Sequence, residues 1–368
     1  MEIYNHRGSL KNTKEAIHRG KLTIGYIGGS VTDGRSMHNW PEPVAAWFVD
    51  RFPGVRIQVE NAAIGATGSD LAVFRAERDL LSRGCDLIFI EIAVNDMYEP
   101  AEKRRRTQEG LVRKLLKDGK SDVVVLYIYC QEMYDDMMNG RIPEPIREFE
   151  VINRHYNLGS AWMGRYALEE IIKGKMRWEE WLPDGLHPQS RGSLSYGQCA
   201  IAFLEEELEE NPTGNPAGSD ILSGDKLPLP LNSAHWANTS FIPFDEVKLE
   251  GAWQIKRWLN LVWIDQVLST SAPGAKLSFH FEGRALSLGF DFGKASSEFK
   301  YRVDGGEWKE AVRDRPDWCG DMNWFRIFNV ADDLMHGQHF FELEVIHGNR
   351  PECSKGNNFN LAMIGVVR

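Results

Sequence analysis

The feature that most constrains the fold is an alternation, through the first 210 residues, of short apolar runs with segments of helical spacing. The apolar runs are rich in β-branched residues and bounded by turn residues, which indicates buried parallel strands; they are 22–27, 55–59, 86–92 and 122–129. The helical spacing recurs at 43–52, 69–82, 101–117, 143–156 and 192–209. Strand and helix in alternation predict a three-layer α/β/α sandwich with a parallel sheet and right-handed crossovers.

The hydrophobicity pattern of the chain changes near residue 241. Apolar and polar residues now alternate with a period of two, which predicts antiparallel strands and a β-sandwich of the jelly-roll kind; the runs are 276–281, 285–290, 299–303, 340–346 and 361–367. The intervening segment is rich in Pro, Gly, Ser and Asn. We therefore expect an α/β domain at 1–210, a linker at 211–240 and a β-sandwich at 241–368.

Length, net charge and hydrophobicity limit the kinds of molecule that this chain is expected to bind. With 368 residues, 42% hydrophobic and 26% charged, the chain is long enough for two folded domains. A net charge of -10 argues against a nucleic-acid or anionic-membrane partner, since both select a basic face. No apolar run approaches the roughly 18 residues of a membrane helix, and the first residues lack the apolar core of a secretory signal. We expect a cytoplasmic protein whose oligomeric state stays open.

No metal or cofactor is expected. The five cysteines are scattered without Cys-x-x-Cys spacing, so the sequence predicts neither a disulfide framework nor a zinc ribbon; they are Cys85, Cys130, Cys199, Cys319 and Cys353. The first three have apolar neighbours and are expected to be buried thiols. The His336 and His339 pair has no third ligand nearby and is typical of a turn between strands. The glycine-rich stretch 25–34 matches neither the dinucleotide fingerprint nor the phosphate loop.

Two separated motifs predict the chemistry. Ser30 stands in Tyr-Ile-Gly-Gly-Ser-Val-Thr directly after the first predicted strand, and Asp184 and His187 stand together in Asp-Gly-Leu-His-Pro. A serine hydroxyl becomes a nucleophile when an imidazole takes its proton and a carboxylate holds that imidazole in one tautomer. Ligands of open parallel sheets bind at the carboxyl ends of the strands, where Ser30 is expected. The two motifs together indicate a serine hydrolase.

These motifs belong to a larger pattern. Four blocks of the chain, 28–32, 61–68, 93–96 and 184–188, match in order the four blocks of the SGNH hydrolases, also called the GDSL esterase and lipase family, which the first 205 or so residues resemble. Gly29 occupies the place of the aspartate in the common Gly-Asp-Ser, a variant familiar within the family. The resemblance implies a flavodoxin-like sheet with Ser30 as the nucleophile.

The resemblance also implies the roles of the other site residues. His187 would be the general base and Asp184 its orienting partner, and the N–H of Ser30 and the amide of Asn95 would stabilise the oxyanion. The family's donor glycine falls at Ala66, with Gly65 one residue earlier, so either can be the remaining donor. A backbone N–H survives the change from glycine to alanine if φ is negative, so activity need not be lost.

Aromatic residues near the last block leave two interpretations open. Trp178 and Trp181 precede Asp184, where they either wall the substrate pocket or pack beneath the catalytic loop. Seven of the twelve tryptophans are assigned to the β-domain, either to stack on sugars or to fill the sandwich core; they are Trp236, Trp253, Trp258, Trp263, Trp308, Trp318 and Trp324.

The function expected from the sequence is that of a serine esterase. It would remove a short acyl group, with acetyl favoured, from a carbohydrate or small-molecule ester through an acyl-enzyme. No long apolar lid is evident, which disfavours a lipase. The alternative is a non-catalytic carbohydrate-binding protein with a degenerate SGNH domain, which the departures at Gly29 and Ala66 favour.

Overall fold

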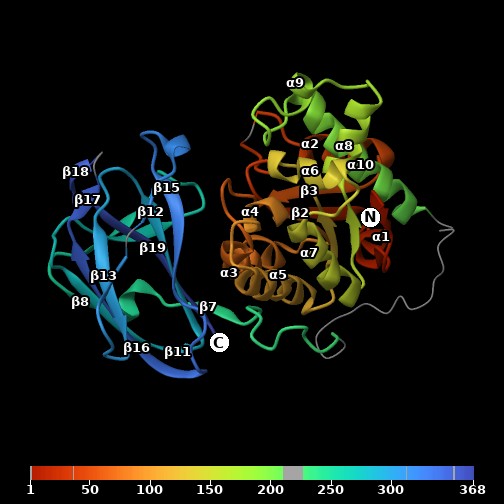
Figure 1. The fold of residues 1–368 in the computed structure, drawn as a ribbon. Helices are drawn as coiled ribbons and strands as arrows, with labels where there is room; N and C mark the ends of the chain where they lie inside the picture. The colour runs from red at the N-terminus through yellow and green to blue at the C-terminus, as the bar shows by residue number, and fades with distance from the viewer. Residues whose placement is uncertain (1, 36, 210–226, 312, 351–352) are drawn as a thin grey trace. The chain divides into compact units, whose positions relative to one another are not determined.

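The chain folds into two compact units. The computed structural model describes residues 2–35, 37–209, 227–311, 313–350 and 353–368 (Figure 1). The units are Met1–Ala237 and Asn238–Arg368, and each is described by itself. Residues 211–226 of the predicted linker lie outside the described residues.

The sheet of the first unit has the flavodoxin-like order. Six strands run in the order β1-β6-β5-β4-β2-β3; they are β1 (Tyr4–Asn5), β2 (Lys21–Gly28), β3 (Arg56–Asn61), β4 (Leu87–Glu91), β5 (Asp122–Leu126) and β6 (Gly159–Ala161). All neighbours are parallel except β1, which pairs antiparallel with β6 at the edge. Without β1, the order of the parallel strands along the chain is 2-1-3-4-5, which confirms the predicted fold class.

Helices cover both faces of this sheet. They are α1 (Lys11–His18), α2 (Pro41–Arg51), α3 (Ser69–Asp79), α4 (Ala93–Asp96), α5 (Ala101–Leu116), α6 (Tyr134–Met138), α7 (Glu144–His155), α8 (Met163–Ile172), α9 (Trp178–Trp181) and α10 (Ser190–Leu208). Helix α5 packs against α3 and α7, and α10 packs against α2 and α8. Figure 1 shows these two groups on opposite sides of the strands. None of the described helices is long and apolar enough to cross a membrane.

The central strands are buried as their composition predicts. Every residue of β4 and β5 is buried, and in β2 only Lys21 is exposed. Within this core, Tyr26 stacks on Phe89 with ring centroids 5.3 Å apart. The expectation of a fully buried strand is wrong for β3, whose residues are exposed or half-buried, because β3 is the edge strand and has a neighbour on one side alone.

The end of the predicted linker packs onto the first unit. Arg113 of α5 donates a hydrogen bond of 2.8 Å to the carbonyl of Pro228, and the Glu109 carboxylate accepts the N–H of Leu231 at 2.6 Å. Trp236 is completely buried. Its backbone lies against Gly110 of α5, where a Cβ would approach within 2.6 Å. Trp236 therefore belongs to the first unit and not to the β-domain to which the sequence assigned it.

The second unit is an antiparallel β-sandwich. One sheet runs β15-β12-β19-β10-β9 with β7 paired to β19, the other runs β14-β13-β16-β11-β8, and β17 and β18 form a separate ribbon. The strands are β7 (Thr239–Phe241), β8 (Lys248–Glu250), β9 (Gln254–Arg257), β10 (Gln266–Thr270), β11 (Lys276–Gly283), β12 (Ala285–Phe292), β13 (Glu298–Val303), β14 (Lys309–Ala311), β15 (Trp324–Ala331), β16 (Gly337–Ile346), β17 (Gly348–Arg350), β18 (Cys353–Gly356) and β19 (Phe359–Val367). All five runs of period two lie on strands.

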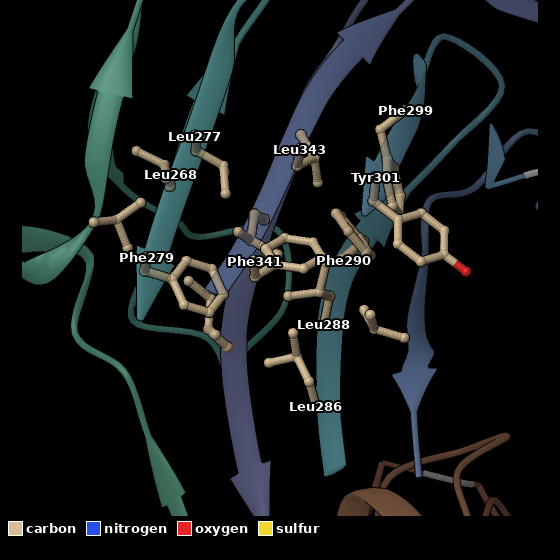
Figure 2. Packing of buried hydrophobic residues seen from close by; sticks show 14 of the residues in the cluster. Leu268, Leu277, Phe279, Leu286, Leu288, Phe290, Phe299, Tyr301, Phe341 and Leu343 are labelled. Atoms are coloured by element: carbon tan, nitrogen blue, oxygen red, sulfur yellow. The ribbon is translucent and has the colours of Figure 1, made fainter. Parts of the chain in front are cut away.

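Phenylalanine and leucine fill the sandwich core, as Figure 2 shows. Phe279 lies 5.1 Å from Phe341 across the β11–β16 pair, and Phe290 stacks on Phe299 at 5.3 Å. Among the described tryptophans of this unit, Trp253 alone packs against the core cluster. The other described tryptophans of this unit therefore do not fill the sandwich core.

The described cysteines are buried free thiols. They are Cys85, Cys130, Cys199 and Cys319, which includes the three for which burial was expected. Burial raises the pKa of the Cys85 and Cys130 thiols to about 12, so they stay protonated. The side chain of Cys353 lies outside the described residues.

Candidate active site

The four sequence blocks meet at the carboxyl edge of the parallel sheet. Ser30 follows β2, Gly65 follows β3 and Asn95 lies in α4 directly after β4. The loop that carries Asp184 and His187 joins α9 to α10. Because neighbouring parallel strands end at the same edge, residues far apart in sequence are brought together here.

Ser30, His187 and Asp184 form a hydrogen-bonded relay. The Oγ of Ser30 lies 2.8 Å from Nε2 of His187, and Nδ1 of His187 lies 2.7 Å from Oδ2 of Asp184. The imidazole is therefore held at both nitrogens, with Nε2 directed at the serine. This is the geometry in which a histidine accepts the serine proton while a carboxylate stabilises the resulting imidazolium.

The loop from Asp184 to His187 is held together by the aspartate itself. Its Oδ1 accepts the N–H of Leu186 at 2.9 Å and the N–H of His187 at 2.7 Å. Burial raises the pKa of Asp184, but the hydrogen bonds from His187 and Leu186 outweigh it and hold the pKa below its usual value. Gly185 has a φ of +82°, a conformation that favours glycine. The carboxylate is therefore charged at neutral pH and faces the imidazole.

The loop that carries Ser30 is held by hydrogen bonds to side chains of neighbouring segments. Thr32 donates its hydroxyl to Oε2 of Glu91 at 2.8 Å, and the indole N–H of Trp40 donates to the same hydroxyl at 2.9 Å. The carbonyl of Thr32 accepts the side-chain amide of Asn61 at 2.8 Å. Burial raises the pKa of Glu91 to about 8, so its acid form dominates at neutral pH. Sequence reasoning missed Glu91, because nothing in an apolar run marks one buried carboxyl group as part of a site.

Gly29 makes room for Asn95. A Cβ at Gly29 would lie 2.0 Å from Oδ1 of Asn95 and 2.9 Å from its Cγ, far inside contact distance. The half-buried Asn95 amide thus packs against the backbone that precedes Ser30. An aspartate at this position, as in the common Gly-Asp-Ser, would displace that amide. The departure at Gly29 is therefore matched to the position of Asn95 in this chain.

Asp96 ties Asn95 to the second block. Its Oδ1 accepts the N–H of Ser69 at the start of α3 at 2.8 Å, and its Oδ2 accepts the amide of Gln108 in α5 at 2.9 Å. Burial raises the pKa of Asp96 to about 7. The short helix α4 is thereby anchored to α3 and α5. The sequence block Asn-Asp contains this residue, but its role depends on contacts between segments far apart in the chain.

The turn of the second block distinguishes its two candidate donors. The N–H of Gly65 donates to Oδ2 of Asp33 at 3.3 Å, whereas Ala66 follows with a φ of +59°. The condition that Ala66 has a negative φ is therefore wrong. A left-handed alanine costs about 1–2 kcal/mol, which explains why glycine is usual at this position. Gly65 lies beside the nucleophile, since a Cβ there would be 3.4 Å from Cβ of Ser30.

The two tryptophans near the last block have different surroundings. Trp181 is completely buried, with its ring 4.8 Å from Tyr129 and 6.3 Å from Tyr196. A side chain without exposed surface cannot wall a pocket, so the prediction of Trp181 as a substrate-binding residue is wrong. Trp178 is half-buried, stacks on Trp181 at 5.1 Å and lies 6.0 Å from Tyr134. Trp178 keeps a surface that a substrate can reach.

Potential metal ligands do not gather anywhere in the described parts of the chain: no group of three His, Cys, Asp or Glu side chains has the required geometry. Of the histidine pair noted in the sequence, His339 has Nδ1 2.7 Å from Asp304 and Nε2 2.9 Å from the carbonyl of Met335. These bonds occupy both of its ring nitrogens.

Solved structures share this two-domain fold. A two-domain esterase active on acetylated mannans, solved alone and with mannopentaose, matches with a TM-score of 0.80 and 23% identity, over 98% of this chain and 96% of that chain. An acetyl xylan esterase from Geobacillus stearothermophilus matches 52% of this chain and 97% of its own, with 17% identity and a TM-score of 0.42. No family model and no curated protein matches the sequence. The first match confirms the fold of both units.

Proposed function

We propose that this chain is a serine esterase of the SGNH type that removes acetyl groups from a carbohydrate. The observation that carries the proposal is the relay of 2.8 Å from Ser30 Oγ to His187 Nε2 and 2.7 Å from His187 Nδ1 to Asp184. Neither distance needs to change for proton transfer to begin.

The reaction follows from the relay. Nε2 of His187 takes the proton of Ser30 as Oγ attacks the ester carbonyl carbon, and a tetrahedral intermediate forms. Its collapse breaks the bond to the alcohol oxygen, which receives the proton from His187 and leaves. Water then loses a proton to His187 and attacks the acyl carbon, and the second tetrahedral intermediate collapses as His187 returns that proton to Oγ of Ser30 and the carboxylic acid leaves. Asp184 orients the imidazole and stabilises its charged form throughout.

Three donors are proposed for the oxyanion: the N–H of Ser30, the N–H of Ala66 and the side-chain amide of Asn95. Gly65 is the weaker choice for the turn, because its N–H already donates to the Asp33 carboxylate. The positive φ of Ala66 strains its backbone but does not remove its N–H. The contact of Asn95 with Gly29 brings its amide next to the nucleophile. Loss of one such donor typically costs a factor of about 10²–10³ in rate.

The fold supports the choice of substrate class. The matching esterase acts on acetylated mannans, and the match spans 98% of this chain, including the β-sandwich. We therefore propose an acetylated mannan-type oligosaccharide as the ester, with the β-sandwich as an accessory unit. The exposed Trp318 of that unit provides an aromatic surface that a sugar ring can cover.

One assay tests the esterase proposal. Wild-type protein should hydrolyse p-nitrophenyl acetate and a Ser30→Ala variant should not, and a fluorophosphonate probe should label Ser30 in the wild type alone. Equal rates in the two proteins, together with no labelling, would favour the non-catalytic sugar-binding protein instead. Release of acetate from acetylated mannan oligosaccharides, compared with acetylated xylan oligosaccharides, tests the substrate class separately.

A further inference from the structure

An exposed tyrosine three residues after Asn95 is held by a hydrogen bond. The side chain of Tyr98 is 73% exposed, the largest exposure of any described aromatic side chain. Its hydroxyl nevertheless donates a hydrogen bond of 2.7 Å to Oε1 of Glu132. Most exposed aromatic rings gain nothing from a fixed position, but a ring that must meet a ligand face to face does.

Both ends of this pair belong to segments that contact the site. Tyr98 follows α4, which carries Asn95, and Glu132 lies in the short helix η2 (Gln131–Met133). The neighbouring Gln131 packs against the catalytic loop, where a Cβ at Gly185 would lie 3.1 Å from Cβ of Gln131.

A second contact joins the same two segments. Sγ of Cys130, two residues before Glu132, lies 3.6 Å from Sδ of Met97, which directly precedes Tyr98. Cys130 is buried, with 3% of its surface exposed. The position of the exposed ring is therefore fixed by a packed base as well as by its hydroxyl.

Two further aromatic side chains contact each other after Glu132. Tyr134, in the helix that follows Glu132, lies 6.0 Å from Trp178 with the rings at 64°. Trp178 in turn stacks on the buried Trp181. Tyr134 and Trp178 are half-buried, unlike the exposed Tyr98.

The chemistry of the Tyr98–Glu132 pair suits a neutral sugar. The bond from Tyr98 lowers the pKa of Glu132, which is therefore a charged acceptor at neutral pH. Burial and the neighbouring Glu132 raise the pKa of Tyr98 to about 12, so its hydroxyl stays a donor. An aromatic face packs on the C–H groups of a pyranose, while an exposed carboxylate accepts sugar hydroxyls. A fatty acyl chain would gain nothing from this carboxylate, and an anionic ligand would be repelled by it.

We propose that Tyr98, oriented by Glu132, is a sugar-binding platform that positions the carbohydrate part of the ester next to Ser30. The ring stacks on a pyranose of the oligosaccharide, and the carboxylate of Glu132 accepts one of its hydroxyls. This inference rests on the proposed esterase function and adds the subsite that recognises the alcohol side of the substrate.

The first test compares two substrates. Tyr98→Ala should lower kcat/KM for an acetylated mannan oligosaccharide by about 3–10-fold, the range of one aromatic contact, mainly through KM. Its kcat/KM for p-nitrophenyl acetate, which has no sugar, should stay within about twofold of the wild type. Tyr98→Phe keeps the ring but loses the hydrogen bond to Glu132. Its kcat/KM for the oligosaccharide should therefore lie between those of the wild type and of Tyr98→Ala. Equal losses on both substrates, or no loss on either, would overturn the platform.

The second test measures binding without turnover. In a Ser30→Ala background, calorimetric titration with the acetylated oligosaccharide should give a dissociation constant about 3–10-fold weaker when Tyr98→Ala is added. Glu132→Gln, which keeps an oxygen for the tyrosine and removes the charge, should weaken binding less. An unchanged dissociation constant in the double variant would contradict the proposal. A wild type that does not hydrolyse p-nitrophenyl acetate would instead reject the esterase function, which separates the two failures.

Discussion

Glycine residues, which have no side chain, determine which groups can lie around Ser30. Gly29 leaves the space that the Asn95 amide fills, and Gly185 permits the positive φ that lets Asp184 bond the backbone of its own loop. Ala66 differs from these glycines, because it has a side chain and still adopts a left-handed conformation. At this scale the site depends on backbone conformation as much as on the three residues of the relay.

Gly29→Ala should therefore act through Asn95. The new Cβ would displace the amide from its position 2.0 Å away, so kcat/KM for p-nitrophenyl acetate should fall by about 10²–10³, as for Asn95→Ala. The double variant should be no worse than either single variant, because both remove the same donor. Losses that multiply in the double variant would show that Gly29 acts on something other than Asn95.

Asp184→Asn should lower turnover while leaving the fold intact. The lost carboxylate orients His187, and a comparable change in a serine protease triad reduces kcat by about 10⁴. Asp184 is half-exposed, so no buried core depends on it. Turnover and melting temperature should be measured together, with Glu179→Gln, an exposed side chain on the neighbouring helix α9, as a control. A melting temperature that falls sharply in Asp184→Asn alone would assign Asp184 a structural role.

The sequence predicts the relay residues because each stands in a motif whose chemistry is local. It leaves open whether Trp181 is buried, since this depends on Tyr196 and Gly192, which pack against it from α10. The same holds for Asp33, which engages Gly65 from a different segment. Contacts between distant segments, rather than residue type, decide these roles.

At the scale of elements, two buried carboxyl groups support the catalytic edge of the sheet. Glu91 ends β4 beneath the Ser30 loop, and Asp96 ends α4 between α3 and α5. Both are buried, and the hydrogen bonds that their carboxyl groups accept from described residues come from neutral donors. The connections between strands and helices at this edge thus depend on groups that titrate near neutral pH.

Stability should consequently fall as the pH rises. The folded-state pKa values of about 8 for Glu91 and about 7 for Asp96 lie above the ordinary values near 4, so the folded state retains protons that the unfolded chain has lost. The loss should begin above about pH 4 and level off above about pH 8. Melting temperatures from pH 5 to 9 should decline less steeply in Glu91→Gln than in the wild type. Parallel curves for the two proteins would contradict this account.

Whether the sequence predicts a helix or strand also depends on whether its cause is local or lies in distant segments. The long helices and central strands are predicted because burial on one or two faces leaves a regular pattern in the sequence. The short β6 and β1 are missed, since Gly159–Ala161 and Tyr4–Asn5 become strands only by pairing with one another and with β5. Helix α4 is too short for any periodicity to reveal it.

At the scale of the whole molecule, the chain is two units whose boundary lies at Ala237. The change in hydrophobicity pattern along the sequence predicts two domains but places residues 227–237 in a linker. Packing of Trp236 against Gly110 and Phe74 assigns this stretch to the first unit. A segment rich in turn residues shows no periodicity, so its attachment can be seen only in the folded protein.

Trp236→Ala should destabilise the first unit. Removing a fully buried tryptophan typically costs about 3–5 kcal/mol, because transfer and cavity terms add. Trp308→Ala, at a side chain that is 40% exposed in the second unit, provides the matched control and should have a much smaller effect. Chemical denaturation of the full chain, monitored through the loss of p-nitrophenyl acetate hydrolysis, would detect the difference. Equal effects of the two variants would show that the segment is not held by Trp236.

The relay itself is open to solvent, with the side chains of His187 and Asp184 50% and 55% exposed. An acyl-enzyme formed there is accessible to any hydroxyl compound that can approach His187, not to water alone. A sugar hydroxyl can donate its proton to the imidazole and attack the acyl carbon in the same way, releasing Ser30 and forming a new ester. At high oligosaccharide concentration, such an enzyme would move acetyl groups between sugars as well as remove them.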